Sequence, residues 1–312
     1  MELIIPILLF VIGLLVIIKG GDLFVDSATW IAKTTGIPSF IIGATIVSFA
    51  TTLPELLVSV FASLSGMPDM AIGNVVGSAI VNISFILAIS LVVSAKAVNR
   101  RELLITGSIM LAATIVLALS SYTGVMSTFG AIILFLILIG YIAYNIYSMK
   151  EAEEEANKVA VDKKIWARKI IIFIIGAIGV VIGSQLLVNN GSAIASMVGI
   201  SERIIGLTIV AIGTSLPELV TTITALKKND TGISVGNIFG ANIINLTFVL
   251  STCSFLSSGL VVDPVSVFSD MPIIILVGLI AIVPPMFTKK FMRWQGFVLL
   301  IVYFSYLFIF VF

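Results

Sequence analysis

Long apolar runs separated by short charged stretches constrain this chain more than any other feature. A bilayer-spanning helix needs about 20 apolar residues. Ten runs of suitable length lie at 2–19, 37–64, 70–95, 103–120, 129–149, 170–190, 204–226, 232–257, 271–288 and 294–312. With 59% hydrophobic and 11% charged residues, the 312-residue chain has no room for a separate soluble domain. The sequence therefore predicts an all-α polytopic membrane protein with ten transmembrane helices.

Charge and residue usage exclude several functions. The net charge of +1 provides no overall field for nucleic acid or for an acidic protein partner. The chain has no histidine, and its one cysteine, Cys253, cannot form an internal disulfide. We therefore expect no imidazole metal site, no cofactor and no obligatory protein partner, with the lipid bilayer as the main surroundings.

The distribution of basic residues predicts the orientation. If the N-terminus lies outside, sixteen lysines and arginines fall on the inner side and only Arg203 falls outside. The positive-inside rule then places both termini outside the cell, in a multi-pass plasma membrane protein. The polar stretch 150–169 becomes a cytoplasmic linker between the halves 1–149 and 170–312.

An internal repeat relates the two halves. Shifting the sequence by 163 residues aligns IGATIVSFATTLPELL at 42–57 with IGLTIVAIGTSLPELV at 205–220, identical at ten of sixteen positions. The same shift aligns GNVVGSAIVN at 73–82 with GNIFGANIIN at 236–245.

The repeat cores span 20–82 and 183–245 and start five predicted helices apart. Because five is an odd number, the second copy lies inverted in the membrane. Inverted repeats with glycine- and proline-interrupted helices indicate a transporter with its site near the midplane.

Two acidic residues, Glu55 and Glu218, lie deep inside apolar runs, and they are repeat mates. An ionisable residue at mid-membrane costs at least about 2.5 kcal/mol on insertion scales. No lysine or arginine lies at that depth, so a bound cation or a proton must supply the countercharge. Two carboxylates suit one divalent or several monovalent cations in an oxygen cage. The alternative is a protonated, hydrogen-bonded pair that only joins helices.

The residues around both glutamates are rich in oxygen and break helices. Four hydroxyl residues lie within one turn: Thr51, Thr52, Thr214 and Ser215. Pro54 and Pro217 each remove a backbone donor and should interrupt the helix just before them. We therefore expect freed carbonyls near Ser48, Ala50, Ala211 and Gly213, and such carbonyls with hydroxyls are ligands for Ca²⁺ and Na⁺.

The partner segments carry small and polar residues. The spacings Gly73-x-x-x-Gly77 and Gly236-x-x-x-Gly240 favour close helix packing over ion ligation. Three residues in the repeat core are better candidates for ligands: Ser78, Asn82 and Asn245. We interpret Asn74 and Asn237 as possible caps of a broken helix end.

These motifs resemble those of the calcium/cation antiporter superfamily, above all the prokaryotic sodium/calcium exchangers. The resemblance implies ten helices in two inverted five-helix halves, with ion sites between the second, third, seventh and eighth helices. It implies that Ca²⁺ is held by Glu55, Glu218, Thr51 and Thr214. It implies that Na⁺ sites add Thr52, Ser215, Ser78, the carbonyls of Ser48 and Ala211, and the region of Asn82 and Asn245.

Two positions depart from the family pattern. Ala241, the repeat mate of Ser78, stands where the family usually has a serine, and Asn245 stands where some relatives have an aspartate. The leading hypothesis is a Ca²⁺/Na⁺ antiporter that works by alternating access, in which helices 1 and 6 slide past the core. The alternatives are a proton-coupled, sodium-independent Ca²⁺ antiporter, suggested by Ala241, and a cation channel. The lack of histidine argues against an enzyme.

Overall fold

The computed structural model describes residues 4–94, 99–155, 162–197, 211–257, 260–263 and 266–311. Seven of the described helices are long and apolar enough to cross a membrane, or eight if one bent helix pair is a single span. Of the two other predicted spans, 294–312 is matched by a shorter apolar helix, and 204–226 begins at residues outside the described part. The fold is therefore that of a mostly helical, polytopic membrane protein.

The first part of the chain forms helices with π-helical turns (η) between them. Its elements are α1 (Ile4–Thr35), α2 (Ser39–Ile42), η1 (Gly43–Val47), α3 (Ser48–Thr51), α4 (Leu53–Leu64), α5 (Pro68–Val81), η2 (Asn82–Leu87), α6 (Ala88–Val93), α7 (Arg100–Ser120) and α8 (Thr128–Glu155). A two-residue strand, β1 (Val125–Met126), lies between α7 and α8.

The second part follows a similar order. Its elements are α9 (Lys163–Met197), α11 (Ala211–Thr214), α12 (Leu216–Lys227), α13 (Thr231–Ile244), η4 (Asn245–Val249), α14 (Leu250–Leu256), β2 (Leu260–Val261), η5 (Ser266–Asp270), α15 (Met271–Thr288), α16 (Arg293–Tyr306) and η6 (Leu307–Val311). Strand β2 pairs antiparallel with β1, with Val125 opposite Val261. The sequence did not predict this short strand pair.

The first helix is longer than predicted. The predicted span 2–19 ends at Lys19, whereas α1 continues to Thr35. The charged side chains of Lys19 and Asp26 are exposed, while Gly20 and Gly21 are buried. A helix can therefore pass through this charged stretch because its charges and its packing residues lie on different faces.

The predicted linker 150–169 is helical at both ends. Helix α8 continues to Glu155, and α9 begins at Lys163. Glutamate, alanine and lysine dominate these ends, and all three are strong helix formers in water. Residues 156–161 of the predicted linker lie outside the described residues.

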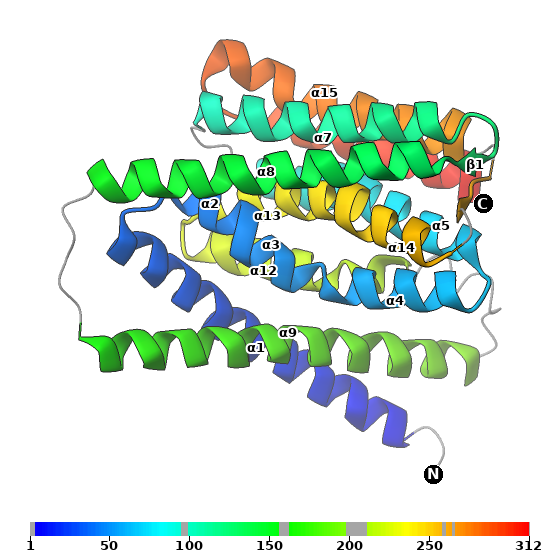
Figure 1. The fold of residues 1–312 in the computed structure, drawn as a ribbon. Coiled ribbons are helices and arrows are strands. Elements are labelled where there is room, and N and C mark those ends of the chain that lie inside the picture. The colour runs from blue at the N-terminus through cyan, green and yellow to red at the C-terminus, as the bar shows by residue number, and fades with distance from the viewer. Residues whose placement is uncertain are drawn as a thin grey trace.

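Helices α1 and α9 cross on one side of the bundle, opposite α7 and α15 (Figure 1). Glycines allow the two backbones to touch. A Cβ atom on Gly20 would lie 2.8 Å from the carbonyl carbon of Gly179, and one on Gly176 would lie 2.5 Å from the amide nitrogen of Phe24. Larger side chains at these positions would separate the helices.

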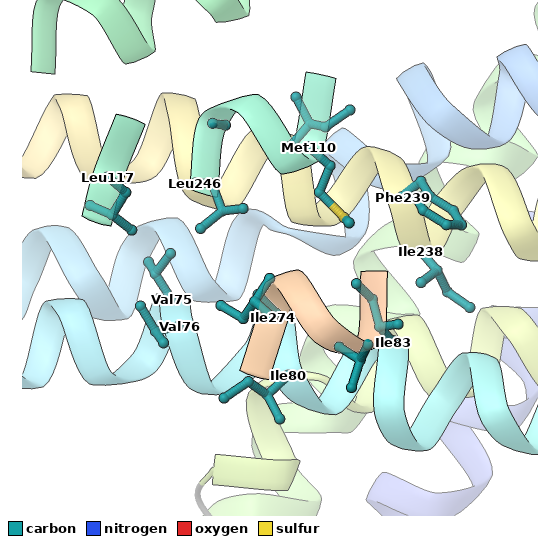
Figure 2. Packing of buried hydrophobic residues seen from close by; sticks show 14 of the residues in the cluster. Val75, Val76, Ile80, Ile83, Met110, Leu117, Ile238, Phe239, Leu246 and Ile274 are labelled. Carbon is teal, nitrogen blue, oxygen red and sulfur yellow. The ribbon is translucent and has the colours of Figure 1, made fainter. Parts of the chain in front are cut away.

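The main hydrophobic core lies between the two partner segments of the repeat. Figure 2 shows residues of both segments in this one core, with Val76, Ile80 and Ile83 from the first segment and Phe239 and Leu246 from the second. Helices α7 and α15 complete this core with residues such as Met110 and Ile274. Burial of these side chains fixes α5–η2 against α13–η4, the segments that carry the predicted ligands.

Candidate ion-binding site

Both motif helices are broken just before their prolines, as predicted. The segments Ser39–Thr51 and Leu53–Leu64 meet at an angle of 44°. In the second repeat, α11 ends at Thr214 and α12 begins after Ser215. Each proline occupies the first turn of the new helix, where a missing amide proton costs nothing. The breaks therefore place a glutamate at the start of each new helix.

Glu55 is the third residue of α4, and Glu218 is the third residue of α12. Both side chains are completely buried. Among the described residues their carboxylate oxygens accept no close, well-aligned hydrogen bond, although the Thr51 hydroxyl acts on Glu218, and the ion pairs found in this part of the chain involve neither residue. The two carboxylates are close enough to repel each other. The partial positive charge of each helix N-terminus stabilises the adjacent carboxylate by at most about 2 kcal/mol.

Two threonines form hydrogen bonds that cross between the repeats. The hydroxyl of Thr51 donates to Oδ1 of Asn237 at 3.0 Å, and the hydroxyl of Thr214 donates to Oδ1 of Asn74 at 3.3 Å. In each case both partners are shifted by 163 residues. Asn74 and Asn237 therefore hold the broken helix of the opposite repeat, and the prediction that they cap helix ends is wrong.

A serine hydroxyl is present on one side of the site only. The Ser78 hydroxyl lies 3.5 Å from the Thr214 hydroxyl, and both side chains are buried. The repeat mate of Ser78 is Ala241, which is also buried and offers no oxygen beside Thr51. The two halves of the site thus differ in their number of oxygen atoms.

Asn82 and Asn245 are completely buried, and each begins a π-helical turn. Such turns occur frequently at functional sites. The amide nitrogen of Asn82 donates to Oδ1 of Asn242 at 2.9 Å, and Oδ1 of Asn82 has no partner among the described residues. Neither side-chain polar atom of Asn245 has a described partner. Both asparagines thus have an oxygen available for a ligand.

Contrary to the prediction, the Ser48 carbonyl is not free of hydrogen bonds. It accepts hydrogen bonds from the backbone amide of Thr52 at 3.0 Å and from the Thr52 hydroxyl at 2.7 Å, and the Thr51 hydroxyl, which shares its one proton with Asn237, lies 3.2 Å away. Thr52 keeps a near-helical backbone, so the last helical turn still closes. The Gly213 carbonyl accepts from the Ser184 hydroxyl at 2.9 Å. The side chain of Ala211 lies outside the described part of the structure.

Ser215 is buried, and its hydroxyl has no described partner. The candidate residues that the structure describes thus come from the two helix breaks and from the α5–η2 and α13–η4 segments facing them. The Thr51–Asn237 hydrogen bond directly joins the segment 42–57 of the first repeat to the segment 236–245 of the second. Contacts between the repeats bring together Thr51 with Asn237, Ser78 with Thr214, and Asn82 with Asn242, whereas Ser215 and Asn245 are buried but make no such contact with the described residues.

Helix packing differs between the two sides of this site. A Cβ atom on Gly236 would lie 2.1 Å from the Phe40 carbonyl oxygen, and one on Gly240 would lie 2.5 Å from that of Ala44. This contact confirms the predicted packing role of the second glycine pair. Gly73, the repeat mate of Gly236, is exposed. The site is therefore tightly covered along the first turns of α13 and less so along those of α5.

Sequence reasoning missed two side chains that shape the site. Asn242 bonds to Asn82 from within α13, and the Tyr141 hydroxyl of α8 donates to the Ala44 carbonyl in η1. Both are polar groups inside apolar runs, which is the signal that could have found them. Their partners lie 160 and 97 residues away, so spacing along the chain gave no indication of the contacts.

The fold and the paired glutamate motifs define a class of membrane transporter. Residues 5–147 and 168–312 match the sodium/calcium exchanger protein family. The chain therefore belongs to this family of cation antiporters, which are transporters and not enzymes.

Relatives cover nearly the whole chain. YrbG, an inner membrane protein of Escherichia coli K12, is 34% identical over 284 residues, which cover 87% of this chain and 86% of YrbG. MaX1, a sodium/calcium exchanger of Methanosarcina acetivorans, is 29% identical and covers 96% of this chain and 97% of its own. A solved structure of the sodium-calcium exchanger NCX_Mj, soaked with 10 mM Na⁺, matches with a TM-score of 0.86 at 28% identity over 99% of each chain.

Proposed function

We propose that this protein exchanges Ca²⁺ for Na⁺ across the membrane by alternating access at the site of Glu55 and Glu218. One observation carries the proposal. The two carboxylates are completely buried and lie near enough to repel each other, the Thr51 hydroxyl is the one described polar side chain that acts on Glu218, and neither carboxylate forms an ion pair with the described residues. Uncompensated buried charges of this kind are strongly destabilising. The missing partner is then a transported cation.

Competition for these carboxylates provides the coupling. Ca²⁺ neutralises both charges at once, and Na⁺ ions neutralise them together, so either loaded state can be enclosed away from water. The empty site carries two uncompensated charges, and its enclosure is disfavoured. The protein then crosses between its two states only when loaded, which is the requirement for exchange.

The ligands that we propose are oxygen atoms, as Ca²⁺ and Na⁺ require. For Ca²⁺ they are Glu55, Glu218, Thr51 and Thr214. For Na⁺ they are drawn from Thr52, Ser215, Ser78, Asn82, Asn245 and the backbone of Ser48 and Ala211. Because the Ser48 carbonyl already accepts hydrogen bonds from the Thr52 amide and the Thr52 hydroxyl, its role as a ligand would require the Thr52 hydroxyl to turn away from it.

The inverted arrangement of ten helices in two halves would make the exchange reversible between two similar states. Pairs of contacts related by the 163-residue shift support this arrangement, as do the unequal environments of Gly73 and Gly236. The close α1–α9 contact supports movement of these two helices together past the site. In the opposite state, α5 would be covered and α13 would be open.

We propose the plasma membrane as the location, with both termini outside and the 150–169 stretch inside. The described chain starts and ends toward one end of the bundle, while α8 ends and α9 begins at the other (Figure 1). This arrangement agrees with an even number of spans. The basic residues then face the cytoplasm, as the positive-inside rule requires.

A proton-coupled Ca²⁺ antiporter is the second candidate, because Ala241 supplies no oxygen opposite Thr51. Protons need only the carboxylates, whereas Na⁺ needs a cage of oxygen ligands. A channel is less well supported, because the covered α13 side gives no continuous path along Gly236 and Gly240.

Ca²⁺ uptake into proteoliposomes tests these functions. Vesicles loaded with Na⁺, vesicles loaded with choline and vesicles with an imposed pH gradient are compared at clamped membrane potential, with Glu55→Gln as the control. The exchanger predicts uptake only from Na⁺-loaded vesicles. Uptake that follows only the pH gradient would replace Na⁺ by protons, and uptake without either gradient would establish a channel.

A further inference from the structure

A second layer of asparagines lies behind the proposed ligands. Asn242, in α13, is completely buried and donates its amide nitrogen to the Ala79 carbonyl at 3.3 Å. A backbone carbonyl can only accept, so this bond fixes which way the Asn242 amide faces. Its Oδ1 atom must then accept, and it does so from Nδ2 of Asn82 at 2.9 Å. Oδ1 of Asn82 is left without a described partner.

Asn74 takes part in a similar series of hydrogen bonds, which runs from the first repeat to a ligand of the second. Its amide nitrogen donates to the Glu55 backbone carbonyl at 3.3 Å and to the Ser59 hydroxyl at 2.9 Å. Its Oδ1 atom accepts the hydroxyl proton of Thr214 at 3.3 Å. Because a hydroxyl has a single proton, donation to Asn74 turns the Thr214 oxygen into an acceptor toward its neighbours on the site side, where the Ser78 hydroxyl lies 3.5 Å away.

We propose that Asn74 and Asn242 are positioning residues that turn the oxygen lone pairs of Thr214 and Asn82 toward the transported cation. In each asparagine a hydrogen bond to a backbone carbonyl, which can only accept, fixes the orientation of the side-chain amide. The Oδ1 atom of that amide then fixes the orientation of one ligand side chain. This inference rests on the proposed function of the glutamate site. Partners that orient ligands in this way typically contribute 10- to 100-fold to metal affinity.

The repeat mates lack such anchors. Nδ2 of Asn237 has no described partner, and neither has the hydroxyl of Thr222, the mate of Ser59. Asn245 has no described partner at either amide atom, because the mate of Asn242 is Ala79, which has no polar side chain. The anchored oxygens are therefore on Thr214 and Asn82, and these two are pre-oriented for the ion.

The decisive experiment is a double-mutant cycle on Asn82 and Asn242. Asn242→Leu removes the orienting amide at similar size, and we expect the Ca²⁺ KM to rise about 10-fold or more with a smaller change in kcat. Asn82→Asp replaces the amide by a carboxylate, which presents an oxygen in either orientation. In that background Asn242→Leu should change the Ca²⁺ KM by less than about twofold, because no amide direction is left to lose.

A matched control is Asn145→Leu. Asn145 is also a buried amide, but it donates to the Tyr141 carbonyl one turn earlier in α8. We expect its Ca²⁺ KM to stay at the wild-type value. If Asn242→Leu does not purify as a monodisperse protein, Asn242→Ala is used in the same cycle. Asn74→Leu alone and combined with Thr214→Ala is the corresponding cycle for the other chain.

The outcomes separate the two proposals. If wild-type protein neither binds Ca²⁺ by calorimetry nor transports it, the proposed function fails. If wild type transports Ca²⁺ but Asn242→Leu leaves the KM unchanged, the positioning role is wrong. It is also wrong if Asn242→Leu raises the KM equally in the wild-type and Asn82→Asp backgrounds, because that result indicates a general structural defect.

Discussion

Helices α5 and α13 are repeat mates, yet the structure gives them different surroundings. On α5, Gly73 is exposed, and the Asn74 amide bonds to Glu55 and Ser59. On α13, Gly236 presses against the Phe40 backbone, and the Asn237 amide nitrogen has no described partner. The residue types are the same at both positions. The difference between the two glycines, where the only close contacts are with backbone atoms, must therefore come from conformation, and it can be exchanged between the halves in another state.

Other differences are fixed by residue type. Ser78 corresponds to Ala241 in the repeat, and Ala79 corresponds to Asn242. No movement can add an oxygen to an alanine. The comparison thus separates features that alternate during transport from features that give the two halves permanently different chemistry.

The largest effect is expected at the two glutamates, because both halves contribute the same carboxylate to the site. Glu55→Gln and Glu218→Gln should each reduce Ca²⁺ transport by about 100-fold or more, since removing one buried carboxylate breaks its pairing with the bound cation, and breaking such a pair costs about 3–5 kcal/mol. The measurement is Na⁺-driven Ca²⁺ uptake in proteoliposomes. Each variant should also melt at a higher temperature than wild type without Ca²⁺, because one uncompensated charge is gone.

The melting curves provide the control for misfolding. A variant that is inactive and also less stable would have lost its fold and would not test the site. If one glutamine variant retained robust exchange while the other did not, the two carboxylates would not act as a pair.

Glycine substitutions test whether the packing difference is conformational. Gly236→Ala places a Cβ atom 2.1 Å from the Phe40 carbonyl oxygen and should cost about 1–3 kcal/mol of stability through overpacking. Gly73→Ala should leave stability almost unchanged but lower the turnover rate, because α5 must be covered in the opposite state. Thermal melting and initial rates measure both effects. Equal destabilisation by both substitutions would contradict the alternating arrangement.

The local features of the site could be predicted from the sequence, and the long-range contacts could not. Pro54 and Pro217 break their helices through backbone chemistry alone, so the breaks were predicted correctly. The Thr51–Asn237 bond joins residues 186 positions apart, and no spacing rule indicates it. The length of α1 was missed for a related reason. Its charged stretch is helical because the opposite face packs on α9.

A smaller effect is expected where the halves differ by residue type. Ala241→Ser would place a hydroxyl beside Thr51, as Ser78 lies beside Thr214. One added oxygen ligand is worth about 1 kcal/mol, so the Na⁺ KM should fall about fivefold. The measurement is Ca²⁺ uptake against internal Na⁺ concentration. If the wild type is proton-coupled, the variant should instead acquire Na⁺ dependence, and an unchanged ion dependence would show that position 241 does not face the ion.

The smallest effect concerns an ion pair that only one half can form. Lys228, after α12, lies 2.6 Å from Asp26 of α1. The repeat mates are Ser65 and Asn189, which carry no charge. If α1 moves during transport, this pair favours the present state over its inverted counterpart. Because Asp26 is 59% exposed, the pair is worth at most about 1 kcal/mol.

Asp26→Asn should therefore change the rate of Na⁺-driven uptake by about twofold at low ionic strength. In 1 M choline chloride the difference should disappear, because the Debye length falls to about 3 Å. Asp22→Asn is the matched control, since Asp22 lies one turn earlier on α1 and forms no ion pair with the described residues. An effect of Asp26→Asn that persists at high salt would arise from packing of α1 and not from charge. The asymmetry between the halves would then have no electrostatic part at this surface.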